Sequence, residues 1–163
     1  MNSQWNFLEG TYWYVPTPFL PALQMNSADT EPTWMIDQTV WQITGYANGY
    51  FWGNCAVLMY EAGTTPDAAP LPYRLAGSVT PDGKVQISFM PLNTLGAAMS
   101  VSGWGTMKQQ LKAWLFEMQM ASGLTDLVAH WAYMAETQEG EDSWDQLPGT
   151  DYSVPDFLKA AGF

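Results

Sequence analysis

The sequence predicts an all-β fold, an antiparallel up-and-down β-barrel of about eight strands. Three observations carry this prediction. Runs rich in aromatic and β-branched residues alternate between apolar and polar positions, tight-turn sequences such as Asn48-Gly49 separate them, and helical periodicity is almost absent. A meander of this kind removes its exposed edges by closing on itself. A two-sheet sandwich is the structural alternative.

The first strand is expected at Gly10–Val15, where alternation places Tyr12 and Tyr14 on the same face. Pro16 ends this strand, and the prolines that follow predict a loop as far as Pro32, because proline cannot donate to a strand ladder. The two tyrosines could present their hydroxyls to one ligand oxygen, although core packing is the commoner role of such a pair.

The second hairpin joins Trp34–Gly45 to Tyr50–Tyr60 through Asn48-Gly49, the strongest short-range turn signal in the sequence. Between Pro32 and Tyr60 the only charged residue is Asp37. Neither face of this hairpin therefore looks solvated, and we expect one of them to face a cavity. The predicted register pairs Ala47 with Tyr50, Trp41 with Ala56, and Asp37 with Tyr60.

After a loop at Glu61–Pro72, the third hairpin joins Tyr73–Thr80 to Lys84–Met90 through Pro81-Asp82-Gly83. The next strand is predicted at Leu95–Met107, where glycines at 103 and 105 indicate a bend or the close approach of another backbone. The register of the third hairpin separates apolar from polar residues and pairs Val79 with Val85 and Leu75 with Phe89.

The last hairpin is predicted at Ala113–Met134. If Ser122-Gly123 is a two-residue turn, Glu117 pairs with Val128, and the only histidine, His130, lies diagonally across from Glu117 on the same face. The opposite face is strongly apolar and must be buried. The face with His130 meets either water or a wet cavity.

We expect a single domain over residues 1–163, with the barrel at about 8–137 and an acidic C-terminal tail at 138–163. The tail contains a short predicted helix at Pro155–Ala161. No repeat of the solenoid kind is present.

Composition excludes several classes of protein. The net charge of -11, from 16 acidic and 5 basic residues, leaves no basic groove for a phosphate backbone, so nucleic acid is not an expected partner. No run approaches the ~20 apolar residues of a membrane helix, and the N-terminus does not resemble a secretory leader, so we expect a cytoplasmic protein without a membrane partner. A single cysteine, Cys55, and a single histidine do not make a metal ligand set, and we expect no cofactor.

The aromatic content is high, with 9 Trp, 8 Tyr and 7 Phe beside 10 Met and only 13% charged residues. Flat side chains and thioethers beyond the needs of a small core predict a cavity for a small hydrophobic or aromatic molecule, an interface in a homo-oligomer, or both. A solid aromatic core is the alternative.

The candidate catalytic residues are His130 and Glu117, because an imidazole oriented by a carboxylate is a usable general base, together with Tyr12 and Tyr14. A solvated outer face is the competing explanation for His130 and Glu117. Arg74, the only arginine, suits a carboxylate ligand through its two parallel donors. The full set of candidate ligand-binding residues is Arg74, Asp37, Tyr60, Trp41 and Trp52.

Three stretches carry a family resemblance: Tyr12-Trp13-Tyr14, Gly49–Asn54 (GYFWGN) and Ile87–Pro91 (ISFMP). Over about residues 8–140 the chain resembles the calycin group of lipocalin-like barrels, and more particularly the phenolic acid decarboxylases. The resemblance implies cofactor-free decarboxylation of a hydroxycinnamic acid, a tyrosine pair that grips the substrate carboxylate, and an assisting arginine and glutamate. By position Tyr12 and Tyr14 match the pair, whereas Arg74 and Glu117 match by residue type only and lie in no recognisable family motif.

The sequence therefore predicts a cofactor-free lyase or isomerase that acts on a small hydrophobic or aromatic molecule in the barrel. His130 and Glu117 would transfer protons, and Tyr12 and Tyr14 would hold an oxygen or a carboxylate. A carrier of the lipocalin type, which binds without catalysis, is the alternative. An assembly protein whose aromatic faces only bind partners is the third possibility.

Overall fold

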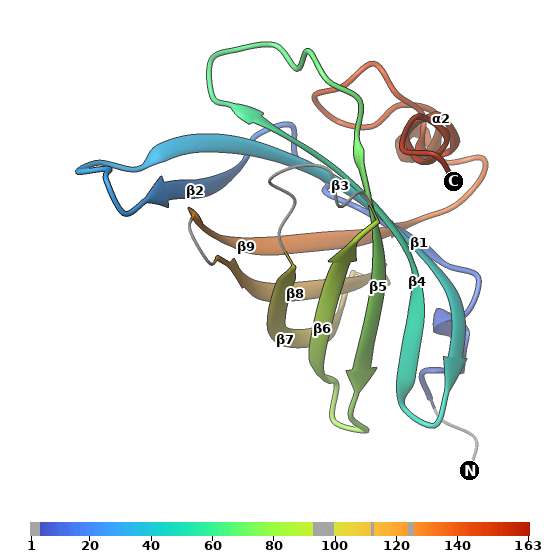
Figure 1. The fold of residues 1–163 in the computed structure, drawn as a ribbon. Helices are drawn as coiled ribbons and strands as arrows, with labels where there is room; N and C mark the ends of the chain where they lie inside the picture. The colour runs from blue at the N-terminus through green and yellow to red at the C-terminus, as the bar shows by residue number, and fades with distance from the viewer. Residues whose placement is uncertain (1–3, 93–99, 112, 124–125) are drawn as a thin grey trace.

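A single antiparallel sheet closes into a barrel (Figure 1). This computed structural model describes residues 4–92, 100–111, 113–123 and 126–163. The predicted up-and-down barrel is confirmed, and it is consistent with a calycin-like fold. A 3-10 helix at Asn6–Leu8 precedes the strands, and two short helices, α1 at Asp142–Asp145 and α2 at Val154–Ala160, follow them. The strands are β1 Tyr12–Tyr14, β2 Leu20–Asn26, β3 Thr33–Ala47, β4 Tyr50–Glu61, β5 Leu71–Val79, β6 Lys84–Pro91, β7 Val101–Gln110, β8 Ala113–Ser122 and β9 Asp126–Thr137.

Two strands, β1 and β2, share one position in the wall, between β3 and β9. The short β1 pairs with residues 40–42 of β3 and 135–137 of β9, and β2 pairs further along the same two strands. The nine strands of the described chain therefore make an eight-position barrel. Pro16 and Pro18 lie in the interruption, as expected for residues that lack an N–H donor.

The loop predicted from Pro16 to Pro32 is wrong in part, because Leu20–Asn26 forms β2. Pro21 lies inside this strand. At Pro21 the strand pairs with β3 alone, since pairing with β9 begins at Leu23. Proline fits at a position that is hydrogen-bonded to only one neighbouring strand, because its missing N–H then leaves no second pairing incomplete.

Gln38 seals the interruption between β1 and β2. Its Oε1 accepts hydrogen bonds from the backbone N–H of Val15 at 3.2 Å and of Thr39 at 3.0 Å. Its Nε2 donates to the carbonyl oxygens of Val15 at 3.2 Å and Pro148 at 2.9 Å. The buried amide thus satisfies backbone groups that a continuous strand would have paired.

The turns of the second and third hairpins form as predicted. Asn48 and Gly49 have φ values of 54° and 88°, the left-handed conformation that a type I′ turn requires, and Gly83 closes the third turn with φ 82°. The register of the third hairpin is confirmed, with Val79 opposite Val85 and Leu75 opposite Phe89.

A β-bulge between Ile43 and Gly45 changes the register of the second hairpin. Near the turn, the predicted pair of Ala47 and Tyr50 is present. The bulge adds one residue to β3, so the predicted pairs beyond it are wrong by one position. There Trp41 pairs with Cys55 in place of Ala56, and Asp37 pairs with Met59 in place of Tyr60.

The last hairpin pairs in a register that differs from the prediction. Glu117 lies opposite Tyr133, five positions from the predicted Val128, and Met120 lies opposite His130. Because the shift is an odd number of residues, each side chain of β9 lies on the opposite face of the hairpin from the one predicted relative to β8. His130 therefore shares the inner face with Met120, and the predicted pair of His130 and Glu117 is wrong.

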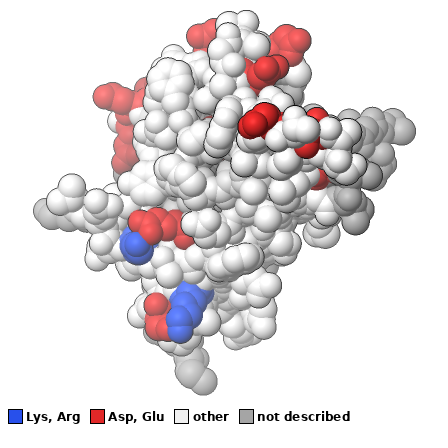
Figure 2. All heavy atoms as spheres, turned by 90° about the vertical axis from the view of Figure 1, so that its left-hand side faces the viewer, with Lys and Arg blue, Asp and Glu red and all other residues white. Residues whose placement is uncertain are grey.

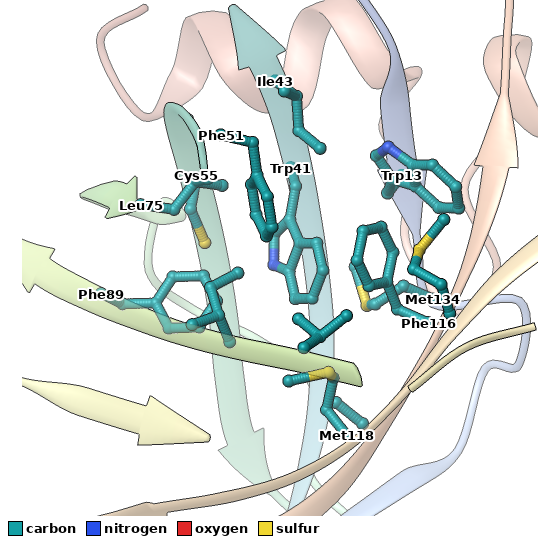
Figure 3. Packing of buried hydrophobic residues seen from close by; sticks show 14 of the residues in the cluster. Trp13, Trp41, Ile43, Phe51, Cys55, Leu75, Phe89, Phe116, Met118 and Met134 are labelled. Carbon is teal, nitrogen blue, oxygen red and sulfur yellow. The ribbon is translucent and has the colours of Figure 1, made fainter. Parts of the chain in front are cut away.

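One end of the barrel, which carries the turns at 48–49 and 80–83, is solid; we call it the closed end. The ring of Phe116 lies 4.5 Å from that of Trp13 and 6.0 Å from that of Phe51 (Figure 3). The N-terminal segment covers this end, where Trp5 Nε1 donates to the carbonyl oxygen of Thr80 at 2.9 Å. All these apolar side chains belong to one buried cluster.

The C-terminal segment packs on the outer face of β3 and β4. Phe157 and Leu158 of α2 form a second buried cluster with Val40 and Ala56. The helix predicted at Pro155–Ala161 is present and starts one residue earlier. In the described chain no helix has the length and apolar character needed to cross a membrane.

Candidate functional site

The other half of the barrel encloses a cavity of about 430 Å³, within the ~300–1,000 Å³ range of small-molecule sites. Trp41, Phe89 and Met134 bound it toward the closed end (Figure 3). Ala68 and Ala69, from the loop between β4 and β5, line it at the opposite end. The wall is mainly apolar, with four methionines among its residues.

A few polar side chains interrupt this apolar wall. Alternation along β3 directs Asp37, Thr39 and Trp41 to the same inner face, and β9 brings His130 to it. Polar groups from different strands thus meet in one cavity. The polar residues of the wall are Gln24, Asp37, Thr39, Tyr73, Ser122 and His130.

Asp37 and His130 form the central pair of the site. Nδ1 of His130 lies 3.8 Å from Oδ2 of Asp37, and the two side chains are 10% and 2% exposed, respectively. The hydroxyl of Thr39 donates to Oδ1 of Asp37 at 2.9 Å. Burial raises the pKa of Asp37, and the charge of His130 and the hydrogen bond from Thr39 oppose that rise in part.

This geometry assigns different roles to the two ring nitrogens of His130. Because Nδ1 faces the carboxylate, the proton of the neutral imidazole is best placed on Nδ1. Nε2 then keeps its lone pair and can accept a proton from a ligand. If it does, Asp37 stabilises the imidazolium that forms.

Two further groups in the wall stay protonated at neutral pH. Burial raises the pKa of the Cys55 thiol well above its usual range, and the charge of Asp37 raises it further. Burial also raises the pKa of Tyr73, with contributions from Cys55 and Asp37. Tyr73 is therefore a neutral hydrogen-bond donor, and Cys55 lacks the thiolate that a nucleophile needs.

Three buried polar atoms of the described residues have no hydrogen-bond partner: Nε1 of Trp41, Oγ of Ser122 and Nδ1 of His130. All three residues line the cavity. Nδ1 of His130 faces Asp37. Because buried polar groups are nearly always hydrogen-bonded in folded proteins, Nε1 of Trp41 and Oγ of Ser122 are free to bind water or a polar group of a ligand.

Several predicted site residues lie outside the cavity. Glu117 points outward, where it forms an ion pair with Lys108. Tyr12 and Tyr14 share a face, as predicted, but that face lies under the C-terminal segment, where Trp144 packs against Tyr12 with ring centroids 4.9 Å apart. The structure therefore does not bring the tyrosine pair near His130.

Arg74 belongs to a polar chain on the outer surface. It donates to Asn54, Asn54 donates to Gln42 at 2.8 Å, and Gln42 donates to the hydroxyl of Tyr12 at 3.0 Å. The Phe163 ring lies 5.6 Å from the guanidinium carbon of Arg74. This chain ties β1, β3, β4 and β5 together and presents no cation to the cavity.

Of the remaining candidates, Asp37 and Trp41 line the cavity, whereas Tyr60 packs in the outer cluster and Trp52 is exposed. Sequence reasoning missed Thr39 and Tyr73. The signal for both was alternation, because Thr39 lies between Asp37 and Trp41 on one face, and Tyr73 shares the face of Leu75.

Among the described residues, no three His, Cys, Asp or Glu side chains gather as a set of metal ligands. The polar groups of the cavity are those of acid–base chemistry and hydrogen bonding. In comparisons of the chain with protein-family models, with curated proteins and with solved structures, no match was found.

Proposed function

We propose that the chain is a cofactor-free lyase or isomerase, in which His130 is the general acid–base and Asp37 orients it. The observation that carries this proposal is the pair of Asp37 and His130 inside a mainly apolar cavity. A buried imidazole–carboxylate pair beside a ligand-sized space supports acid–base chemistry as the function of the cavity.

The chemistry that suits this pair is the movement of a proton next to a carbonyl group. Nε2 of His130 removes a proton from carbon, and the negative charge moves to the carbonyl oxygen as an enolate forms. In an isomerase the same proton returns at another carbon, so that no atom is lost. In a lyase the enolate expels a leaving group, which departs with the proton. Trp41 and Tyr73 supply neutral donors that can stabilise the oxygen.

The substrate and test reaction need not be known in advance, because proton removal is visible as hydrogen–deuterium exchange. We expect the protein to accelerate deuterium uptake from D₂O at the methyl group of 2-acetonaphthone, an enolisable aromatic ketone, as followed by NMR. His130→Ala should reduce this acceleration at least ~100-fold, the scale of a lost general base. Uptake that is equal in both proteins would refute the catalytic role.

A carrier without catalysis is the second candidate, and the large apolar fraction of the wall favours it. The two functions differ in one result. A carrier binds the ketone without accelerating exchange, whereas the enzyme does both.

We also propose that the chain forms a homo-oligomer through the outer face of β4–β9. Two cross-strand rows on this face contain no charged residue. In Figure 2 the visible basic side chains lie beside acidic ones. Two such ion pairs, of Lys84 with Asp82 and of Lys108 with Glu117, occur among the described residues. Two copies with a net charge of -11 each meet with least repulsion on an uncharged face. One row contains Trp131, Gln119, Trp104, Gln86, Ser78 and Tyr50, and the next contains Ala129, Ala121, Ser102, Ser88, Ala76 and Trp52.

The cytoplasm is the proposed compartment, because a chain with one buried cysteine needs no oxidising environment for its fold.

A further inference from the structure

The charges around the cavity restrict what it can hold. No lysine or arginine is among its described lining residues, and the only arginine, Arg74, is engaged on the outer surface. The one group that can become cationic, His130, faces Asp37. A carboxylate that entered would lose its hydration without gaining a free cation, and it would also meet the charge of Asp37.

The unpaired indole N–H of Trp41 restricts the ligand further. The side chain is 1% exposed, and its Nε1 has no hydrogen-bond partner among the described residues. In Figure 3 this nitrogen lies on the side of the ring nearer to Cys55 and Phe89, which also line the cavity. An indole N–H is a donor only, so the group that completes it must be a hydrogen-bond acceptor.

We infer that the ligand of this cavity is an uncharged, mostly apolar carbonyl compound, whose oxygen accepts a hydrogen bond from Nε1 of Trp41, and that the cavity rejects the corresponding carboxylates. The choice of a carbonyl among acceptors rests on the proposed function, which needs an acidified C–H bond. The rejection of carboxylates does not rest on it, and it departs from the hydroxycinnamic acids that the family resemblance implies.

The test uses three ligands with one ring system, measured by isothermal titration calorimetry: 2-acetonaphthone, its hydrocarbon counterpart 2-isopropylnaphthalene, and 2-naphthoate. We expect the ketone to bind at least ~10-fold more tightly than the carboxylate. This comparison uses the unmodified protein, so it does not depend on the folding of a variant. Equal or tighter binding of 2-naphthoate would overturn the inference. So would the absence of ketone binding at 1 mM, which means a binding free energy weaker than about 4 kcal/mol.

The variant Trp41→Phe removes the donor and keeps an aromatic ring. This variant should bind the ketone at least ~5-fold more weakly, and its affinity for the hydrocarbon should change less than ~2-fold, because only the ketone loses a hydrogen bond. Trp114→Phe is the matched control, since Trp114 packs against Trp5 and Phe7 and does not line the cavity. An equal loss for ketone and hydrocarbon would refute the role of Trp41. Tight ketone binding without deuterium exchange would refute only the proposed catalysis.

Discussion

Nδ1 of His130 lies 3.8 Å from Oδ2 of Asp37, although the strands that carry them, β9 and β3, are not hydrogen-bonded neighbours. The position between those strands belongs to β1 and β2, and it is interrupted where the prolines fall. The acid–base pair therefore spans an interrupted part of the wall. Its function can be tested separately from its effect on stability.

Asp37→Asn should reduce deuterium exchange at least ~10-fold, because an amide can accept from Nδ1 but cannot balance the charge of an imidazolium. Ketone affinity should change less than ~3-fold, since Asp37 is not the group assigned to bind the carbonyl. Glu117→Gln is the control, because Glu117 contacts Lys108 on the outer surface. A loss of exchange in Glu117→Gln equal to that in Asp37→Asn would contradict the assignment.

The same substitution, Asp37→Asn, should stabilise the fold at neutral pH. Burial raises the pKa of Asp37 above its ordinary value of 3.8. The stability that goes with its neutral form is therefore fully present below that value and is lost as the pH rises through the folded-state pKa. An asparagine at this position does not ionise, so the variant keeps this stability as the pH rises. Thermal unfolding should show a higher Tm for Asp37→Asn at pH 7 and a smaller difference at pH 3.5; a difference that grows on acidification would contradict the prediction.

Cys55 should react slowly with thiol reagents in the folded protein. The side chain is fully buried, and its raised pKa leaves little thiolate at pH 8. We expect the rate of reaction with a disulfide reagent to rise at least ~100-fold in denaturant. Ser27→Cys, at an exposed position after β2 and outside the proposed interface, provides a reactive control in the Cys55→Ala background. Rapid labelling of native Cys55 would show that the cavity admits polar reagents.

Gly105→Ala should destabilise the barrel by about 2 kcal/mol or more. A Cβ at Gly105 would lie 1.8 Å from the carbonyl oxygen of Glu117, on the neighbouring strand, so the backbones of β7 and β8 would have to separate. Gln110→Ala, at an exposed position on the same strand and outside the proposed interface, should change the free energy of unfolding by less than about 0.5 kcal/mol. Denaturant titration measures both values. Equal effects would rule out the close approach of these two strands.

Trp104→Glu should dissociate the proposed homo-oligomer. Trp104 is 65% exposed and lies in one of the two uncharged rows of the outer face, so the new carboxylate would be buried without a partner in the contact. Trp34→Glu is the control, because Trp34 is also exposed but lies at the start of β3, outside that face. Sedimentation should show an oligomer for the unmodified protein and for Trp34→Glu, and a monomer for Trp104→Glu. If the unmodified protein is monomeric at 100 µM, the free energy of association is weaker than about 5.5 kcal/mol, and the proposal is refuted.

The predictions that succeeded depend on local chemistry. The turn at Asn48-Gly49 requires residues that adopt positive φ, and the glycines of β7 lie where another backbone approaches. The third hairpin has a turn of defined length and one clearly apolar face, so its register followed from the sequence. These features determine the fold class without any knowledge of distant contacts.

The predictions that failed depend on how many residues a connection or a bulge takes up. One extra residue near Gly45 moved Asp37 from Tyr60 to Met59, and a longer connection than Ser122-Gly123 placed His130 and Glu117 on opposite faces of the hairpin. Because side chains alternate with a period of two, an odd error exchanges wall and surface completely. His130 lines the cavity, and the carboxylate next to it, Asp37, comes from β3, which only the closed barrel brings near.

The cavity occupies one half of the barrel only. Buried side chains, Phe116 among them, fill the closed end, and Ala68 and Ala69 of the β4–β5 loop line the cavity at its other end. If the proposed catalysis holds, we expect substitutions at Ala68 and Ala69 to change the rates of ligand binding and release while Asp37 and His130 stay as they are.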